Sequence, residues 1–300
     1  MTHIRFPLPT GPIVLPTRSR TACLAGIASW SACRPVPRAV RAGSWWFVKA
    51  LGPLLLPFPR REWVPPFAAG EWRELVARWA ALLGPIEAFA VYEPAQAGRL
   101  ALALLAVGST GAIGFIKVRP ASQTSVEGTA LSAASAAGTV LCPQVIGAAK
   151  LGEVSYLVTT AFPSGLHRPP KPERVAVVVE DVSRSLGAIP RPTSVPHDWE
   201  PMHGDFAPWN LREQRGMGLI LFDFEHAGWA PPLADLVFYA AACSALGMTV
   251  PSLDGRALSS AVEYWSTRLP MRMGESGRDQ RLFRGMMSYL GSLSLGEPDF

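Results

Sequence analysis

The chain has 300 residues, of which 49% are hydrophobic and 17% are charged, and its formal net charge is +5. A chain of this length and apolar content can bury a sizeable core in one large domain or two, so the composition indicates a globular protein. No apolar run reaches the length of about 20 residues that a bilayer-spanning helix needs, so a transmembrane segment is not expected.

The positive charge is concentrated near the N-terminus. Residues 1–61 contain nine Lys or Arg and no acidic residue, whereas residues 186–300 contain nine basic and thirteen acidic residues. The four cysteines form neither metal-ligand pairs nor a dense disulfide framework, which suits a reducing compartment, and we expect a cytoplasmic protein. An arginine-rich, acid-free start also fits a transit peptide in composition, but its prolines disfavour a presequence helix.

The N-terminal part predicts a hairpin and a helix. Residues 3–8 and 12–16 read as two short strands, which their prolines confine to a sheet edge. Residues 36–58 carry Trp45 and Trp46 among apolar and basic side chains. They predict either a helix lying on an anionic membrane surface or a helix packed on the protein with its basic residues facing water, and we favour the second.

A second helix and a sheet follow. Residues 71–83 have apolar side chains at helical spacing and an i,i+4 pair of Glu74 and Arg78, and Gly84 then ends the predicted helix. The strands that we expect after this helix are residues 88–92, 99–107, 112–118, 145–149 and 155–161.

The third of these strands contains a lysine. Lys117 lies within the apolar sequence Gly-Phe-Ile-Lys-Val, and a lysine buried in a strand needs an anionic partner. Glu127 is the only carboxylate between residues 94 and 152, and it stands near the start of a helix predicted over residues 124–137. It can pair with Lys117, or it can form a capping box with Thr124.

The C-terminal half predicts helices around one motif. We expect helices over residues 173–186, 233–246, 255–268 and 277–293. Between the first two lies the sequence His-Gly-Asp-Phe-Ala-Pro-Trp-Asn of residues 203–210, and an apolar run then ends in Asp-Phe-Glu at residues 223–225.

The motif has the residue types that phosphoryl transfer needs, which are groups that position the acceptor and neutralise phosphate charge. A loop carboxylate, Asp205, can orient the acceptor hydroxyl and take its proton. Asn210 and Asp223 offer the oxygen ligands that magnesium prefers. A hairpin with its turn at residues 212–218 brings these three side chains to one edge.

These residues resemble the catalytic and metal-binding loops of the aminoglycoside phosphotransferase and choline kinase family, which has a protein-kinase-like fold. The segment Pro-Pro-Leu-Ala-Asp-Leu of residues 231–236 adds to the resemblance, because the family often carries Pro-x-x-Asp-Leu just after the metal carboxylate. The match is specific over residues 197–240 and weaker over residues 86–166.

The resemblance implies an α+β, two-lobed protein-kinase-like fold. Residues 1–65 would be a basic N-terminal extension packed on the N-lobe, residues 66–163 the N-lobe with its nucleotide-binding antiparallel sheet, and residues 164–300 the helical C-lobe. The implied activity is that of a small-molecule kinase, which transfers the γ-phosphoryl group of ATP or GTP to a hydroxyl of an unidentified small acceptor with Mg2+.

The resemblance also implies roles for individual residues. Lys117 would grip the nucleotide phosphates, with Glu127 supporting it, and the backbone of Thr160, Ala161 and Phe162 would bind the purine. Glu225 would reach a second metal or the acceptor. His203 and Asp235 would be structural supports of the loop. The expected phosphate-covering loop, residues 93–98, has one glycine and so departs from a glycine-rich loop.

Two other classes of protein stay open. One is a kinase-like module that binds nucleotide or a partner without chemistry. The other is a metal-dependent hydrolase, in which His203, Asp205, Asp223 and His226 hold a transition metal. No nucleic-acid partner is expected, membrane contact through the basic N-terminal region is a minor alternative, and the oligomeric state is not indicated.

Overall fold

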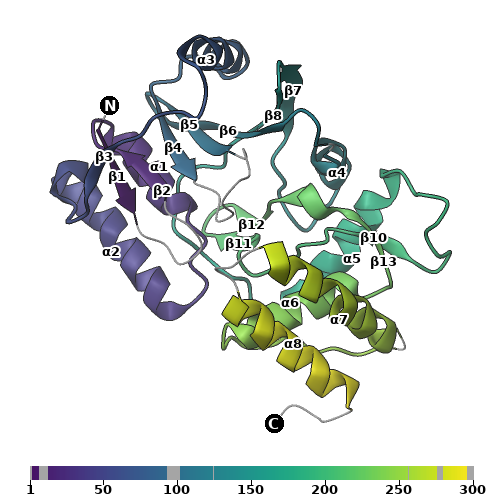
Figure 1. Ribbon diagram of the computed structural model, residues 1–300. Coiled ribbons are helices and arrows are strands. Elements are labelled where there is room, and N and C mark those ends of the chain that lie inside the picture. Colours follow the sequence, from purple (N-terminus) through teal and green to yellow (C-terminus); the bar gives the residue numbers. More distant parts are fainter. Residues whose placement is uncertain are drawn as a thin grey trace. The chain divides into compact units, whose positions relative to one another are not determined.

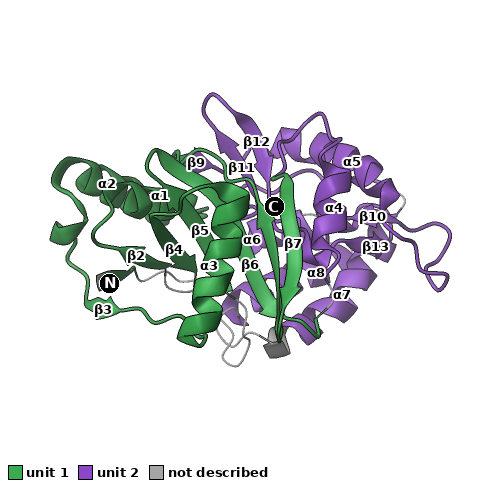
Figure 2. Ribbon diagram, turned by 90° about the horizontal axis from the view of Figure 1, so that it is seen from above, with its two compact units in different colours: residues 1–124, 143–166 green, residues 125–142, 167–300 purple. Residues whose placement is uncertain are grey.

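The computed structural model describes residues 2–6, 13–92, 102–123, 125–255, 257–275 and 280–295. The predicted phosphate-covering loop and Thr124 lie outside these residues. The chain forms two compact units, which Figure 2 colours separately. Unit 1 comprises Met1–Thr124 and Pro143–Leu166, and unit 2 comprises Ser125–Cys142 and His167–Phe300. The described helices include none that is long and apolar enough to cross a membrane.

Unit 1 is built on an eight-stranded antiparallel sheet in the order β3-β1-β2-β4-β5-β6-β8-β7 (Figure 1). The strands are β1 (Thr2–Phe6), β2 (Ile13–Pro16), β3 (Arg60–Glu62), β4 (Ala88–Tyr92), β5 (Leu102–Gly108), β6 (Gly111–Pro120), β7 (Val145–Leu151) and β8 (Val154–Thr159). The last five agree with the predicted strands to within three residues at each end, because their apolar residues and turn glycines are contiguous in the sequence.

One face of this sheet packs on helix α3 (Ala69–Leu83), which confirms the helix predicted there. Leu75 and Trp79 of α3 are fully buried against side chains that include Leu104 and Ala106 of β5. Successive side chains of a strand point to opposite faces, so the neighbouring residues of β5 pack on the other side of the sheet.

That other face is covered by helix α1 (Arg20–Ser29), whose buried residues pack with Leu105 and Val107 of β5. The helix approaches the sheet closely at Gly26. A Cβ atom at this position would lie 2.8 Å from the Cβ of Ala90 and would overlap the side chain of Leu15. A glycine is therefore required for this contact, although glycine is a weak helix former.

The position of the N-terminal hairpin differs from the prediction. Strands β1 and β2 pair as expected, but β3 adds beyond β1 and β4 pairs with β2, so both strands are interior. The edge was predicted from the prolines. Pro16 occupies the last position of β2, where it leaves the pairing of Val14 and Leu15 intact.

Helix α2 (Pro35–Leu51) packs on the body of unit 1 through Val48 and exposes Lys49, as we favoured, but one of its basic residues faces inward. Arg41 is buried, 2% exposed, and its Nη1 donates a hydrogen bond to the carbonyl oxygen of Trp30 at 2.7 Å. Apolar side chains such as Val36 and Trp46 are exposed instead. The short 3-10 helix η1 (Pro53–Leu55) follows and also exposes leucines.

Unit 2 is mostly helical, and its helices confirm those predicted, except that the helix predicted over residues 255–268 continues through Pro270 to Glu275. The elements are α4 (Glu127–Ala134), β9 (His167–Arg168), η2 (Pro172–Arg174), α5 (Val175–Ser185), η3 (Leu186–Ala188), β10 (Glu200–Met202), β11 (Leu211–Gln214), β12 (Gly218–Leu221), η4 (Phe224–His226), β13 (Gly228–Ala230), α6 (Ala234–Ala245), α7 (Leu258–Glu275) and α8 (Gln280–Ser294). Small sheets form from β12-β11-β9 and from β10-β13. The predicted α+β class, with one antiparallel-sheet unit and one mostly helical unit, is confirmed.

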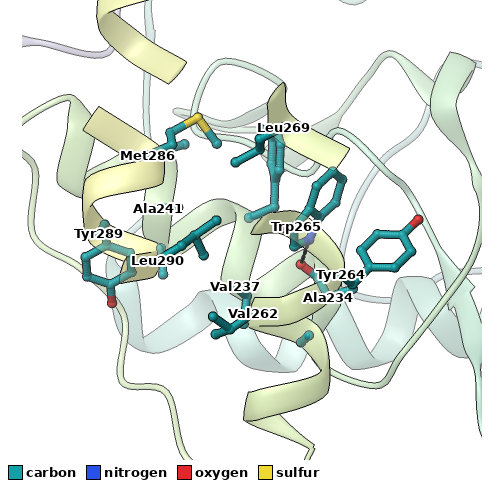
Figure 3. Close-up of a cluster of buried hydrophobic side chains, with 14 of the residues drawn as sticks. Ala234, Val237, Ala241, Val262, Tyr264, Trp265, Leu269, Met286, Tyr289 and Leu290 are labelled. Atoms are coloured by element: carbon teal, nitrogen blue, oxygen red, sulfur yellow. Dashed lines mark hydrogen bonds between the residues drawn. The ribbon is translucent and has the colours of Figure 1, made fainter. Parts of the chain in front are cut away.

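The core of unit 2 lies between α6, α7 and α8 (Figure 3). Trp265 of α7 is 1% exposed, and its Nε1 donates a hydrogen bond to the carbonyl oxygen of Ala234 at 2.7 Å. This bond gives the buried indole N–H the acceptor that it needs. It thereby ties α7 to the helix turn that carries Asp235.

Gly26 provides a test of the α1–sheet contact. In an exposed helix, Gly→Ala usually stabilises a protein by about 0.5–1 kcal/mol. At Gly26 we expect Gly26→Ala to destabilise by about 1–3 kcal/mol, because the added methyl group overfills the contact with Ala90 and Leu15. Urea unfolding followed by circular dichroism measures the difference.

The matched control is Gly43→Ala in α2. Gly43 is exposed, and a Cβ there would meet no atom within 4 Å, so this variant should be neutral or slightly stabilised. Equal changes in the two variants would contradict the close contact at Gly26.

Candidate active site

A loop of residues 203–210 joins β10 to β11, and one buried carboxylate holds its first turn. Asp235, in the first turn of α6, is 3% exposed. Its Oδ2 accepts the backbone N–H of His203 at 2.6 Å, and its Oδ1 accepts that of Gly204 at 3.0 Å. Hydrogen bonds to a carboxylate are among the stronger ones, so this residue fixes where the loop begins.

Gly204 lets the loop pack closely on the segment that follows the sequence Asp-Phe-Glu of residues 223–225. Its φ of +79° lies in the region that favours glycine. A Cβ atom at this position would overlap the carbonyl oxygen of His226. Only glycine satisfies both conditions, so the second residue of the motif is dictated by backbone geometry and close approach.

The His203 ring is fully buried and has a partner on each nitrogen. Its Nδ1 accepts the backbone N–H of Asp205 at 3.2 Å, and its Nε2 lies 2.7 Å from the carbonyl oxygen of Phe222. The hydrogen-bond network therefore assigns the proton to Nε2, which donates to that carbonyl. Both nitrogens are used within the protein, so His203 joins the loop to the residue before Asp223.

Asp205 and Asn210 are joined directly. The Nδ2 of Asn210 donates to the Oδ2 of Asp205 at 2.8 Å and to the backbone oxygen of Asp205 at 2.9 Å. Within the described residues the side-chain oxygen of Asn210 accepts no hydrogen bond. The hairpin of β11 and β12 then carries the chain back, and the N–H of Phe222 donates to the backbone oxygen of Asn210 at 3.1 Å.

Arg272 of α7 is a site residue that the sequence analysis missed. Its Nη2 donates to the carbonyl oxygen of Gly204 at 2.9 Å, and its Nη1 lies 3.7 Å from the Oδ1 of Asp205. The guanidinium also stacks over the ring of Trp265, 5.1 Å from its centroid. No local pattern marks Arg272 in the sequence, since it stands more than sixty residues after the loop.

The pKa values of two carboxyl groups are raised, those of Asp205 in the loop and Asp235 in α6. Burial raises the pKa of Asp205 to about 7, with a further contribution from the charge of Asp223, while Arg272 and the Asn210 hydrogen bond act in the opposite direction. Burial also raises the pKa of Asp235 to about 6, although its hydrogen bonds from His203 and Gly204 favour the charged form.

A second group of carboxylates lies beside the loop. Oxygen atoms of Glu127, Asp223 and Glu225 all lie within 4.8 Å of one another. Glu127 is 2% exposed and begins α4, which packs against η4. Its backbone N–H donates to the hydroxyl of Ser125 at 3.2 Å. Helix α4 thus places the glutamate that was predicted to support Lys117 next to the predicted metal carboxylates.

The backbone is strained at two points around this cluster. Among the described residues, Asp223 and Leu233 are the non-glycine residues with positive φ, at +68° and +69°. Asp223 precedes η4, and Leu233 precedes α6 and its Asp235. Left-handed non-glycine residues are costly and tend to occur at functional sites, because the surrounding structure must hold them.

The remaining predicted residues lie in unit 1. Lys117 of β6 is half-buried and alternates with Ile116 and Val118, which pack on the α3 face, so it lies on the opposite face of the sheet. Since Lys117 and Glu127 belong to different units, their ion pair stays a prediction.

The predicted purine-binding segment, residues 160–162, follows β8 in unit 1. The Thr160 N–H and hydroxyl bond to the backbone of Gln144, at 2.8 and 2.9 Å. No hydrogen bond joins the main-chain groups of Ala161 to another described residue.

Part of the chain matches a known protein family. The sequence model of the phosphotransferase enzyme family matches residues 191–267, which contain the loop, the hairpin and most of α7, and this match confirms the predicted resemblance. No curated protein sequence matches the chain. The family match supports a phosphotransferase.

Solved structures show a similar fold. A putative fructosamine-3-kinase from Haemophilus somnus 129PT superposes with a TM-score of 0.50 at 13% identity, over 74% of this chain and 97% of that one. An amicoumacin kinase in complex with AMP-PNP and Ca2+ gives a TM-score of 0.45 at 14% identity, over 74% and 88%. The aminoglycoside phosphotransferase APH(4)-Ia with ADP and hygromycin B gives 0.39 at 11%, over 73% and 91%.

The raised pKa of Asp205 predicts how stability depends on pH in the metal-free protein. A pKa raised from 3.8 to about 7 means that the folded state binds this proton more tightly than the unfolded state. The stabilising effect is complete below about pH 4 and is lost as the pH rises through about 7. The Asp205→Asn variant cannot titrate, so its stability relative to the parent should increase over that range, by about 4 kcal/mol.

Urea unfolding in the presence of a chelator at about pH 5 and about pH 8 measures this difference. The control is Asp198→Asn, which changes an exposed carboxylate of the same unit. If the stability of each variant relative to the parent is the same at both pH values, Asp205 does not carry the predicted proton.

Proposed function

We propose that the protein is a magnesium-dependent kinase that transfers the γ-phosphoryl group of ATP or GTP to a hydroxyl of a small molecule. The observation that carries the proposal is the arrangement of Asp205, which Asn210 and Arg272 hold on the loop, beside the carboxylates of Asp223 and Glu225. The family match over residues 191–267 supports the same chemistry.

Asp205 has the properties of a group that takes the proton of the acceptor hydroxyl. Its side chain is 18% exposed, so a substrate hydroxyl can reach it, and its pKa of about 7 lies near working pH, where a general base is most effective. As the acceptor oxygen bonds to the γ-phosphorus, the bond from that phosphorus to the bridging oxygen breaks. The hydroxyl proton passes to Asp205, and the nucleoside diphosphate leaves.

The donor set fits a magnesium ion. Carboxylates and an amide oxygen are the hard ligands that Mg2+ prefers, with water and phosphate oxygens completing its shell. We propose that the side-chain oxygen of Asn210 and the carboxylate of Asp223 hold the ion, with Glu225 at a second ion or at the acceptor. A bound Mg2+ neutralises charge on the phosphate oxygens.

Glu127 has two candidate roles. Its carboxylate lies near Asp223 and Glu225, which suits a ligand of the cation or of its water. The resemblance assigns it instead to Lys117, which we propose grips the α- and β-phosphates. The backbone of Thr160, Ala161 and Phe162 is proposed to bind the purine, as the resemblance implies.

His203 and Asp235 are proposed as supports of the loop. Asp235 accepts two backbone N–H groups, and both nitrogens of His203 are used within the protein. A metal hydrolase that relies on His203 as a ligand is disfavoured for this reason, since a coordinating nitrogen must be free of a proton and of other partners.

Asp205→Asn tests the proposal. The amide cannot take the hydroxyl proton, so we expect turnover to fall by about 100- to 10,000-fold while nucleotide binding changes little. A coupled assay of ADP release, run with amino alcohols, aminoglycosides, sugars and nucleosides, supplies the activity. Calorimetry with ATP and Mg2+ supplies the binding.

Turnover that survives this substitution would overturn the role of Asp205. A parent protein that binds ATP with Mg2+ but consumes none with any acceptor would instead favour a binding module without chemistry.

Arg272→Lys tests the positioning of Asp205. Lysine keeps the charge but cannot span the Gly204 carbonyl and Asp205 with one planar group. We expect kcat to fall about tenfold, with the KM for nucleotide unchanged, because one hydrogen bond to a charged group is worth about 1.5–3 kcal/mol. Arg268→Lys is the control, since Arg268 is exposed on the same helix and stacks on Tyr264. A similar loss in both variants would indicate a general effect on α7.

A further inference from the structure

Helix α2 and the 3-10 helix η1 turn apolar side chains to the outside. Six large ones lie within twenty residues, and we call them the α2–η1 strip: Val36 (74% exposed), Val40 (49%), Trp46 (57%), Leu51 (56%), Leu54 (54%) and Leu55 (59%). The described residues contain seven other exposed large apolar side chains, and those are scattered from Val64 to Leu295. Isolated exposed apolar residues are ordinary, but a contiguous group marks an interaction surface.

The strip is a consequence of how α2 packs. Its inward face contains Val48, which is fully buried, and Arg41, which is bonded to the Trp30 carbonyl. The outward face repeats apolar residues at helical spacing, with Val36, Val40 and Leu51 close to one line along the helix. A helix that only covers the sheet would place these side chains inward, so the strip is not explained by packing within the chain.

The sequence around the strip is basic, and its first acidic residue is Glu62. Residues 1–61 contain nine Lys or Arg and no Asp or Glu. Exposed basic side chains stand before the strip (Arg34), within it (Lys49) and after it (Arg60 and Arg61). The ammonium of Lys49 lies 4.8 Å from the ring centroid of Trp46, which places a cation and an indole together at the outer surface.

We propose that the α2–η1 strip lies on an anionic lipid membrane, with α2 parallel to the surface. Apolar side chains flanked by Lys and Arg are the features that bind a helix in the plane of the membrane interface, and indole rings favour that depth. The absence of acidic residues over 61 positions matches a negatively charged surface. A second copy of the chain fits less well, because it would bring equally basic surfaces together.

Flotation of the whole protein with lipid vesicles tests this surface. We expect the protein to float with vesicles of phosphatidylcholine and phosphatidylserine and to remain below with phosphatidylcholine alone. Val40→Glu and Leu51→Glu place a charge on the strip without disturbing the core, and each should reduce binding at least tenfold. Val177→Glu is the control, because Val177 is 58% exposed on α5 and should leave binding unchanged.

Lys49→Gln measures the electrostatic contribution to membrane binding. One basic residue near an anionic surface contributes about 1 kcal/mol, so this variant should bind about fivefold more weakly, with a reduced dependence on salt. Acceptor phosphorylation in solution should be the same in all four variants, since none of them alters the proposed site.

Three results would overturn the proposal. The first is no binding to either kind of vesicle, and the second is equal binding to both. The third is loss of a concentration-dependent dimer in Val40→Glu, measured by analytical ultracentrifugation without lipid, which would make the strip a contact between copies of the chain.

Discussion

The carboxylate of Asp235 is the constraint on which the site depends. It accepts the N–H groups of His203 and Gly204 from a buried position at the start of α6. Those two residues in turn contact the segment around Asp223: His203 bonds to the Phe222 carbonyl, and Gly204 packs on the His226 backbone. One buried charge therefore positions the loop that carries Asp205 and, through that loop, the chain that carries Asp223 and Glu225, the proposed metal carboxylates. The two segments behave as one structural piece.

This arrangement places like charges close together. Asp205 interacts unfavourably with Asp223 and Glu225, and Glu127 adds a buried carboxylate to the same cluster. The left-handed conformation of Asp223 adds backbone strain. Folding must supply the free energy that holds these groups in place, and a divalent cation would relieve their repulsion. Sites of this kind are usually less stable than the same fold with neutral residues, and the core between α6, α7 and α8 provides the compensating stability.

Local patterns in the sequence predicted much of the fold and the loop, because spacing along the chain sets them. The hairpin joining Asn210 to Asp223 and helix α3 are examples. Features that depend on distant contacts could not be predicted. The short basic strand β3, which makes β1 interior, carries no strand pattern, and nothing near Arg272 links it to Asp205. The inward position of Arg41 was missed because its Nη1 bonds to the Trp30 carbonyl, a contact with a residue outside α2.

Arg272 belongs to α7, a helix separate from the loop that carries Asp205. The loop motif supplies the carboxylate, but a separate helix, far along the chain, supplies the cation that adjusts its proton affinity. Substitutions in α7 can therefore change the pKa of Asp205 while every residue of the motif stays the same. A graft of the motif alone would carry Asp205 without the cation that lowers its pKa.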